Sequence, residues 1–332
     1  MENDAYHRPV MVREVVAQLV RRAGIYVDGT LGGGGHSLAI LQALRDKGME
    51  EGSFLIGIDQ DRFAIGEAEK ALVAFREKTR FVQGNFRNIA GIVSSIRERE
   101  LPGKEVTGIV LDLGVSSYQI DTPERGFSYL RSGPLDMRME PGGKLSASDI
   151  VNTFQERELA DIFFRFGEEK KSRKIAGAVC SWRREHGGIA GTQDLAAIVR
   201  SVVRSPDQQI KSLSRVFQAL RIAVNDELGS LETVLKDGTG CLGPLGRMAV
   251  MSYHSLEDRM VKHYFRALAA DDWGPKRVGL REPLHRAAFR LVTPRPVVAA
   301  DDEVSENPRA RSAKLRVVEK KDCSGGESER DC

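Results

Sequence analysis

Short apolar runs alternate with longer helical patterns along the first third of the chain. The runs predict four strands, at residues 25–27, 54–58, 80–82 and 108–111. Leu38, Leu41 and Leu44 recur at helical spacing after the first run, and residues 64–75 do so after the second. This alternation is typical of β-α-β units, and strands as apolar as these are buried on both faces. The pattern therefore predicts an α/β fold around a parallel sheet.

The alternation stops after Asp112. Residues 113–148 are rich in Gly, Ser, Pro and Asp, a composition that a compact domain normally tolerates only in a functional loop, so we expect this segment to face a substrate. Helical spacing then continues without a strand signal to about Arg247. Within this stretch an apolar stripe follows Thr192, which is a candidate N-cap. The stretch therefore predicts a helical insertion.

The last third of the chain returns to a mixed pattern. A long helix is predicted from about Leu213 to Leu235, ended by the glycines at 238, 240 and 243. Further strands are predicted at residues 248–251, 289–292 and 315–318, with a helix at about 256–268. We expect a core at residues 1–137 and 213–320, an inserted helical subdomain at 138–212, and a disordered polar tail at 321–332.

Composition narrows the class of protein. Of the 332 residues, 41% are hydrophobic and 29% are charged, as in an ordinary globular protein of roughly two domains. The four cysteines are far apart with no C-x-x-C pair, which argues against a disulfide framework and a thiolate zinc site. No apolar run approaches the ~18 residues of a membrane span, and the first residues lack the form of a signal peptide. We expect a cytoplasmic protein.

The formal net charge of +3 conceals three basic segments. Residues 165–184 carry seven Lys and Arg against two Glu, and residues 276–295 and 309–321 each carry six against one acidic residue. A single basic run is most often a solvated helix face. Three such runs on an otherwise acidic chain favour a surface that binds phosphate groups.

The segment YVDGTLGGGGHS places five glycines between a predicted strand and a predicted helix. Glycines allow a ligand to approach main-chain N–H groups and the positive end of the following helix. The dinucleotide motif G-x-G-x-x-G fits poorly, because Ser37 occupies the third glycine position. Asp28 and Asp59, at the ends of the first two strands, instead match the arrangement found for S-adenosylmethionine. Asp59 could accept both ribose hydroxyls, and Asp28 could orient the loop or face the cationic methionine end.

Seven segments of the chain together resemble one known family. They are DGTLGGGGHS, LDLGVSSYQID, ERGFS, GPLDMRM, FQALRIAVNDEL, SYHSLEDR and RSAKLR. The chain is similar, from about His7 to Val318, to the bacterial ribosomal RNA cytosine-N4 methyltransferases of the RsmH or MraW type. The resemblance implies a Rossmann-like class I methyltransferase core with an all-helical insertion. It also implies transfer of a methyl group from S-adenosylmethionine to a cytosine of 16S ribosomal RNA, in the decoding region of the small subunit.

The resemblance implies which residues bind the cofactor. Carried over position by position, they are Gly34, Gly35, His36, Asp59, Phe86, Asp112 and Gln119. Residue chemistry agrees for two of them, because Phe86 could pack on the adenine face and Asp112 ends a strand where ligands meet parallel sheets. The roles of His36 and Gln119 rest on the resemblance alone.

The acceptor for the hydrogens of the cytosine amine stays open. This amine is a weak nucleophile because its lone pair is delocalised into the ring, so the enzyme must position it and accept its hydrogens. Many amino-methyltransferases carry D/N-P-P-Y/F after the fourth strand, but this chain has Asp112-Leu113-Gly114-Val115 there. Asp112, main-chain carbonyls of the loop and Asp136 are the candidates.

Other residues are candidates for RNA binding. A target base must leave its stack, and the aromatic side chains of Tyr118, Phe127 and Tyr129 either offer a stacking face or pack over the sheet. Arg138 could hold a phosphate and His254 lies just beyond a predicted strand, whereas we expect Met137 and Met139 to pack. The cations expected to bind RNA phosphates are Lys170, Lys171, Arg173 and Lys174.

Two alternative functions remain open at the level of sequence. One is a nicotinamide-dependent oxidoreductase, and the other is a non-catalytic RNA-binding factor in ribosome assembly. The chain has no H-E-x-x-H motif and no EF-hand spacing, so we expect no metal. The partner is expected to be 16S RNA, either naked or in the small subunit, and the oligomeric state stays open.

Overall fold

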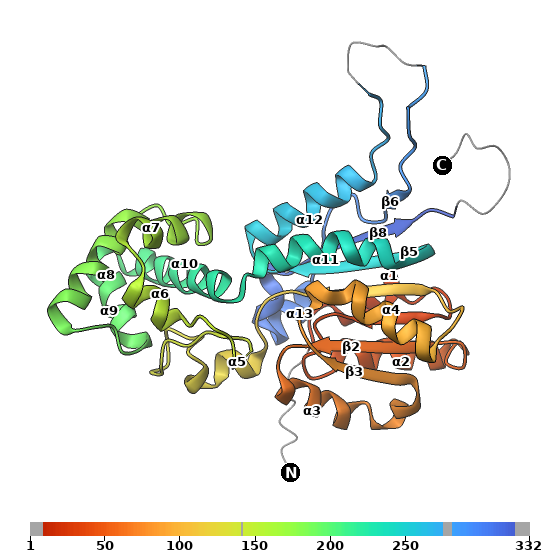
Figure 1. Ribbon diagram of the computed structural model, residues 1–332, viewed down its shortest axis with the longest axis horizontal. Coiled ribbons are helices and arrows are strands. Elements are labelled where there is room, and N and C mark those ends of the chain that lie inside the picture. The colour runs from red at the N-terminus through yellow and green to blue at the C-terminus, as the bar shows by residue number, and fades with distance from the viewer. Residues whose placement is uncertain (1–8, 141, 275–280, 323–332) are drawn as a thin grey trace. The chain divides into compact units, whose positions relative to one another are not determined.

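The computed structural model describes residues 9–140, 142–274 and 281–322. The chain divides into two compact units, one made of Met1–Gly114 with Ser230–Cys332 and the other of Val115–Gly229 (Figure 1). The tail expected to be disordered lies outside the described residues from residue 323 onward. None of the described helices combines the length and the apolar character needed to cross a bilayer.

The first unit contains a mixed sheet. Its strands are β1 (Ile25–Asp28), β2 (Phe54–Asp59), β3 (Thr79–Gln83), β4 (Val106–Asp112), β5 (Leu242–Ser252), β6 (Phe289–Leu291), β7 (Val297–Val298) and β8 (Lys314–Lys320). The order across the sheet is β3-β2-β1-β4-β5-β8-β6, with β7 paired to β8. Strands β1 to β5 are parallel to their neighbours among themselves, whereas β8 is antiparallel to β5, β6 and β7. The predicted Rossmann-like α/β fold is confirmed.

Helices cover both faces of this sheet (Figure 1). One face carries α1 (Val12–Leu19), α2 (Gly35–Asp46) and α3 (Arg62–Ala71), and the other carries α4 (Ile89–Glu100), α11 (Glu227–Cys241) and α12 (Ser255–Leu268). Shorter elements complete the unit, namely α13 (Asp301–Glu306) and the 3₁₀ helices η1 (Val73–Lys78), η2 (Phe86–Asn88) and η4 (Pro308–Ser312). Along β2, Leu55 packs toward the first face and Ile56 toward the second. Burial on both faces explains why consecutive strand positions are apolar.

The long helix predicted from about Leu213 to Leu235 is wrong in its boundaries. Helix α10 (Pro206–Asn225) ends at Asp226, whose φ of 47° is left-handed, and α11 then begins. The glycines do not end α11 where predicted. A Cβ atom on Gly238 would lie 3.2 Å from Cε of Met248, so this glycine lets the helix approach β5 closely.

The second unit is helical. Besides α10 it contains α5 (Ser117–Asp121), η3 (Pro123–Arg125), α6 (Ala147–Thr153), α7 (Glu156–Arg165), α8 (Ser172–His186) and α9 (Thr192–Val202). Its core is a separate cluster that includes Leu159, Phe163, Val179, Leu195 and Phe217. The periodic apolar stripes of the sequence are therefore the faces that these helices bury against one another.

The expected limits of the insertion, residues 138–212, are too narrow. Leu135 and Met137 are fully buried in the core of the second unit, and so is the apolar face of α10. Thr192 is not the N-cap of α9, which is Gly191. Its hydroxyl instead donates to the carbonyl oxygen of Arg131 at 2.8 Å and accepts from the N–H group of Gly133 at 3.1 Å. Residues of the segment 113–148, which was expected to face a substrate, thus pack and hydrogen-bond within this unit.

Candidate active site

Three aspartates lie at the carboxyl ends of neighbouring parallel strands. Asp28 ends β1, Asp59 ends β2 and Asp112 ends β4, and β1 lies between the other two strands. Ligands of open parallel sheets bind at this edge. The strand order thus brings the three carboxylates, each expected at the end of a strand, to one rim of the sheet.

The glycine loop connects β1 to α2. Gly32 and Gly34 have φ angles of 50° and 80°, which other residues adopt at a cost. A Cβ atom on Gly35 would lie 2.7 Å from Cγ of Pro9, and one on Gly34 would lie 3.2 Å from the Cα atom of Ala68. These glycines are thus required by the loop backbone and by packing, in addition to the approach of a ligand that the sequence predicts for the loop.

Asp28 organises the loop. Its Oδ2 atom accepts a hydrogen bond from the Ser37 hydroxyl at 2.7 Å, and its Oδ1 atom accepts from the N–H group of Thr30 at 3.2 Å. Burial raises the pKa of Asp28 above its ordinary value, although the nearby His36 and the Ser37 hydroxyl act in the opposite direction. Of the two roles predicted for Asp28, the geometry supports orientation of the loop. Ser37, which breaks the dinucleotide motif, is the partner it uses.

Asp59 keeps acceptor capacity at the rim. Its Oδ2 atom accepts from the N–H group of Gly32 and its Oδ1 atom from that of Asp61, both at 2.8 Å. Burial raises the pKa of Asp59 to about 6, against the opposing effect of these two hydrogen bonds. A carboxylate oxygen can accept more than one hydrogen bond, so both oxygens remain able to receive hydroxyl groups.

The residues around Asp59 fit the nucleoside and the methionine parts of S-adenosylmethionine. Within the part of the chain that the structure describes, no side chain caps the N-terminus of α2, where the N-cap is Gly34, so its first N–H groups can receive a carboxylate. Phe86 lies near the end of β1, since a Cβ atom on Gly29 would be 3.4 Å from the Cβ atom of Phe86. An aromatic ring, a carboxylate and a helix N-terminus thus occur on one rim.

A hydrogen bond from Tyr253 holds the Asp112 carboxylate, and His36 lies near it. The hydroxyl of Tyr253 donates to its Oδ1 atom at 2.6 Å, and Nδ1 of His36 lies 3.7 Å from its Oδ2 atom. Burial and the Asp112 carboxylate raise the pKa of Tyr253 well above its ordinary value, so the phenol stays protonated and remains the donor. The N–H group of Asp112 also donates to the Thr30 hydroxyl at 2.6 Å. The carboxylate therefore has a fixed orientation.

The orientation of His36 follows from its second contact. Nε2 of His36 lies 2.9 Å from the carbonyl oxygen of Val10, and a carbonyl can only accept, so Nε2 carries a proton. Nδ1 is then directed toward Asp112. The sequence gave His36 no role apart from the family resemblance, and it missed Tyr253 altogether. The Tyr253 contact arises because β5 pairs with β4, which no local pattern reveals, whereas the His36 contact comes from the pairing of β1 with β4.

Several predicted residues belong to the second unit. Gln119 is buried and forms a capping box with Ser116 at the start of α5. Asp136 and Arg138 pair with each other, with Oδ2 of Asp136 2.6 Å from the guanidinium. Burial acts to raise the pKa of Asp136, but the hydrogen bonds from Arg138 outweigh it and hold the pKa below its ordinary value. The charges of Asp136 and Arg138 are thus already paired with each other.

The predicted stacking face is largely part of a core. Phe127 is only 9% exposed inside the second unit's cluster, and the Tyr129 ring packs edge-on against Phe217 with centroids 5.6 Å apart. These two side chains therefore pack, but within the helical unit and not over the sheet, as the alternative to stacking had supposed. Met137 and Met139 also pack against this cluster, as expected.

The remaining candidates lie on helix ends. His254 is the N-cap of α12, where its Nδ1 atom accepts from the N–H group of Glu257 and its Nε2 atom lies 3.2 Å from the Glu257 carboxylate. The four predicted RNA-binding cations are all exposed at the start of α8, namely Lys170, Lys171, Arg173 and Lys174. The capping contacts account for His254, whereas the cations of α8 face water.

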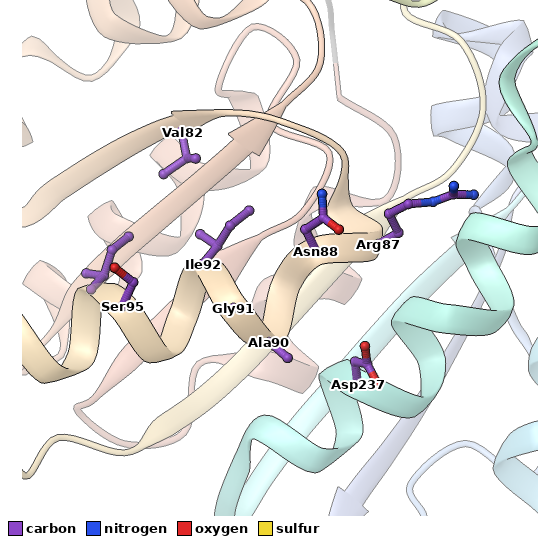
Figure 2. Close-up of a pocket in the computed structure, with 9 residues that line it drawn as sticks. Val82, Arg87, Asn88, Ala90, Gly91, Ile92, Ser95 and Asp237 are labelled. Carbon is purple, nitrogen blue, oxygen red and sulfur yellow. The ribbon is translucent and has the colours of Figure 1, made fainter.

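A hollow of about 650 Å³ is lined by residues other than the rim aspartates. Its lining comes from β3, from α4 with the residues just before it, and from Asp237 of α11, as Figure 2 shows. Gly34, His36, Asp59 and Asp112 are not among its lining residues. Arg87 at its edge donates from Nη2 to the hydroxyl of Ser230 at 2.7 Å. The hollow is therefore distinct from the aspartate rim.

The fold and the rim define a methyltransferase. Residues 4–321 match the MraW methylase family, and the chain belongs to this family. The resemblance predicted from the seven sequence segments is thereby confirmed. Enzymes of this class take their methyl group from S-adenosylmethionine, the ligand that the residues around Asp59 fit.

Individual relatives share most of the sequence. The chain is 77% identical to ribosomal RNA small subunit methyltransferase H of Chlorobium phaeobacteroides strain BS1, over 100% of both chains. It is 64% identical to the protein of the same name from Prosthecochloris aestuarii, over 99% of both chains. Among solved structures, an rRNA methylase from Streptococcus thermophilus matches with 12% identity and a TM-score of 0.38, covering 94% of this chain and 95% of that one.

Proposed function

We propose that this chain transfers the methyl group of S-adenosylmethionine to the exocyclic N4 amine of a cytosine in 16S ribosomal RNA. The observation that carries the proposal is the rim itself, where Asp59 keeps open acceptor positions beside the uncapped N-terminus of α2. The small-subunit RNA substrate is supported by the names of the full-length relatives. Such a substrate makes the cytoplasm the expected location.

Each part of the rim has a role in holding the cofactor. When bound, S-adenosylmethionine supplies an electrophilic methyl group on a sulfonium. Asp59 accepts the two ribose hydroxyls, the first N–H groups of α2 face the methionine carboxylate, and Phe86 packs on the adenine. Asp112 accepts hydrogen bonds from the methionine ammonium. Gln119 remains a predicted cofactor contact from the second unit.

The chemical step requires alignment and a hydrogen acceptor. The N4 amine forms a bond to the methyl carbon as the bond from carbon to sulfur breaks, and N4 then loses one proton, which a carboxylate such as Asp112 or the solvent takes up. Asp112 and the main-chain carbonyls that follow β4 lie at the strand end where this amine must arrive. Asp136 is the less favoured acceptor, because its carboxylate is already committed to Arg138.

The cations at the start of α8 are proposed to bind RNA phosphates. The N-terminus of a helix carries partial positive charge, so cations there are electrostatically unfavourable in isolation. Lys170, Lys171, Arg173 and Lys174 are nevertheless all placed there and all exposed. A polyanion would relieve this repulsion and release counterions. Arg138 and His254 are kept as lesser substrate candidates, because both side chains already have protein partners.

Methyl transfer to small ribosomal subunits is the direct test. Purified protein is incubated with labelled S-adenosylmethionine and either 16S RNA or assembled subunits, and the modified nucleoside is identified by mass spectrometry. We expect N4-methylcytidine. Cofactor binding without transfer to either substrate would favour a non-catalytic assembly factor, and thermal stabilisation by NAD alone would favour an oxidoreductase.

A further inference from the structure

A two-stranded ribbon leaves the first unit between α12 and β6. An antiparallel bridge joins Asp272 to His285, with the N–H group of Asp272 donating to the His285 carbonyl at 2.8 Å. The N–H group of Leu284 donates to the Asp272 carbonyl at 2.7 Å. Figure 1 shows these two described segments running side by side beyond α12 and β6. The base of the ribbon therefore has a defined main-chain structure.

The ribbon exposes two large apolar side chains together. Trp273 follows Asp272 and Leu284 precedes His285, so the two residues occupy paired positions across the ribbon. Trp273 is 52% exposed and Leu284 is 54% exposed. Neither belongs to a hydrophobic core cluster of the described chain. The tryptophan and the leucine together therefore form one small exposed apolar surface on the ribbon.

Two arginines lie on the segment of the ribbon that carries Leu284. Arg281, His285 and Arg286 are exposed on the returning segment, where Glu282 is the one acidic residue between Arg281 and Phe289. The two aspartates on the outgoing segment accept hydrogen bonds from main-chain N–H groups. Oδ1 of Asp271 accepts from the N–H group of Ala287 at 2.8 Å, and Oδ1 of Asp272 accepts from that of Gly274 at 2.9 Å. The returning segment lies in the second basic window of the sequence, residues 276–295, which the rim does not use.

We propose that the ribbon is an RNA-binding element in which Trp273 stacks on an unpaired base of the ribosomal RNA and the neighbouring cations bind its phosphates. The inference rests on the proposed function, which supplies the RNA. Aromatic stacking combined with positive charge is the general means by which proteins hold single-stranded nucleic acid. A single Trp-Leu pair offers too little apolar area for insertion into a bilayer, whereas one aromatic face suffices for one base.

Tryptophan fluorescence tests the stacking directly. The chain has two tryptophans, so Trp182→Phe leaves Trp273 as the only indole. Titration of this variant with 16S RNA should quench its fluorescence, and added salt should reverse the quenching. In parallel, Trp273→Ala should weaken RNA binding about tenfold, while Trp273→Phe should retain most of the affinity. Val73→Ala removes another exposed apolar side chain, 69% exposed on η1, and should leave RNA affinity unchanged.

The outcomes separate this inference from the proposed function. Full RNA affinity in Trp273→Ala, with no quenching of Trp273 by RNA that is bound, would overturn the inference. A blue shift with vesicles of phosphatidylserine and phosphatidylcholine, but no response to RNA, would replace RNA by a membrane surface. The proposed function is judged separately by methyl transfer from the wild-type protein, which can succeed when Trp273 proves irrelevant.

Discussion

Replacing Tyr253 by phenylalanine removes the hydroxyl that donates to Oδ1 of Asp112 at 2.6 Å. The ring and its packing are retained, so the fold should tolerate the change. Asp112 then keeps the contacts with His36 and the Thr30 hydroxyl but loses the donor that fixes one of its oxygens. We expect weaker binding of S-adenosylmethionine, because Asp112 is proposed to receive the methionine ammonium.

The magnitude follows from the type of hydrogen bond. A hydrogen bond from a neutral hydroxyl to a carboxylate contributes roughly 1.5–3 kcal/mol. The Asp112 side chain is 15% exposed, so water can replace part of the lost interaction and the lower end of this range applies. A loss of about 1.5 kcal/mol corresponds to an increase of roughly tenfold in the dissociation constant.

Isothermal calorimetry with S-adenosylmethionine measures this effect. Tyr264→Phe is the matched control, because it removes a hydroxyl that lies 3.1 Å from Oγ1 of Thr239, also in the first unit. This variant should lose about 1 kcal/mol of unfolding free energy at most and bind the cofactor normally. Thermal unfolding of both variants separates an effect on binding from an effect on folding.

An unchanged dissociation constant in Tyr253→Phe would refute the assignment of Asp112 to the ammonium. If the single-turnover rate at saturating cofactor fell at the same time, Asp112 would be reassigned to the hydrogens of the N4 amine. Equal losses of cofactor affinity in Tyr253→Phe and Tyr264→Phe would show that the effect is a general loss of packing and not the orientation of Asp112.

Three further predictions concern other parts of the chain. The pKa of Asp59 is about 6, and its ionised form accepts the ribose hydroxyls. Cofactor affinity should therefore be constant above pH 6 and fall about tenfold per pH unit below it. Calorimetry across pH should show this dependence in the wild type and a flat profile in Asp59→Asn. The salt dependence of RNA binding should change when the charges at the start of α8 are reversed, at Lys170, Lys171, Arg173 and Lys174. The slope of log affinity against log salt concentration, measured by fluorescence anisotropy, should fall by about 3. Reversing the exposed Lys70 and Lys236 should leave this slope unchanged. Gly34→Ala should lower the free energy of unfolding by about 1–2 kcal/mol in denaturant titrations, because φ at this position is 80° and Ala68 lies close; a stability equal to that of the wild type would contradict the packing role of the loop.

The sheet edge was predictable because local sequence determines it. Asp28, Asp59 and Asp112 each follow an apolar run, and parallel strands must bring their carboxyl ends to one edge. The family segments then assigned the loop to a cofactor. Here the sequence contained enough information, since every step depended on neighbouring residues or on a shared strand direction.

The hydrogen bond from Tyr253 to Asp112 was not predictable in this way. Tyr253 lies 141 positions from Asp112 and meets it only because β5 pairs beside β4. The C-terminal end of the helix that became α11 was misjudged for a related reason. A glycine such as Gly238 predicts a helix end from local propensity, but tertiary packing against Met248 keeps it inside α11.

The connectivity of the chain has a consequence for biosynthesis. Residues 115–229 are contiguous and contain their own hydrophobic cluster, whereas β4 cannot pair with β5 until more than a hundred further residues have left the ribosome. Domains generally fold as units during translation. The helical unit is therefore expected to complete its folding on the nascent chain. During that time the sheet that carries the aspartates is incomplete, and the edge of β4 stays exposed until the C-terminal strands are synthesised.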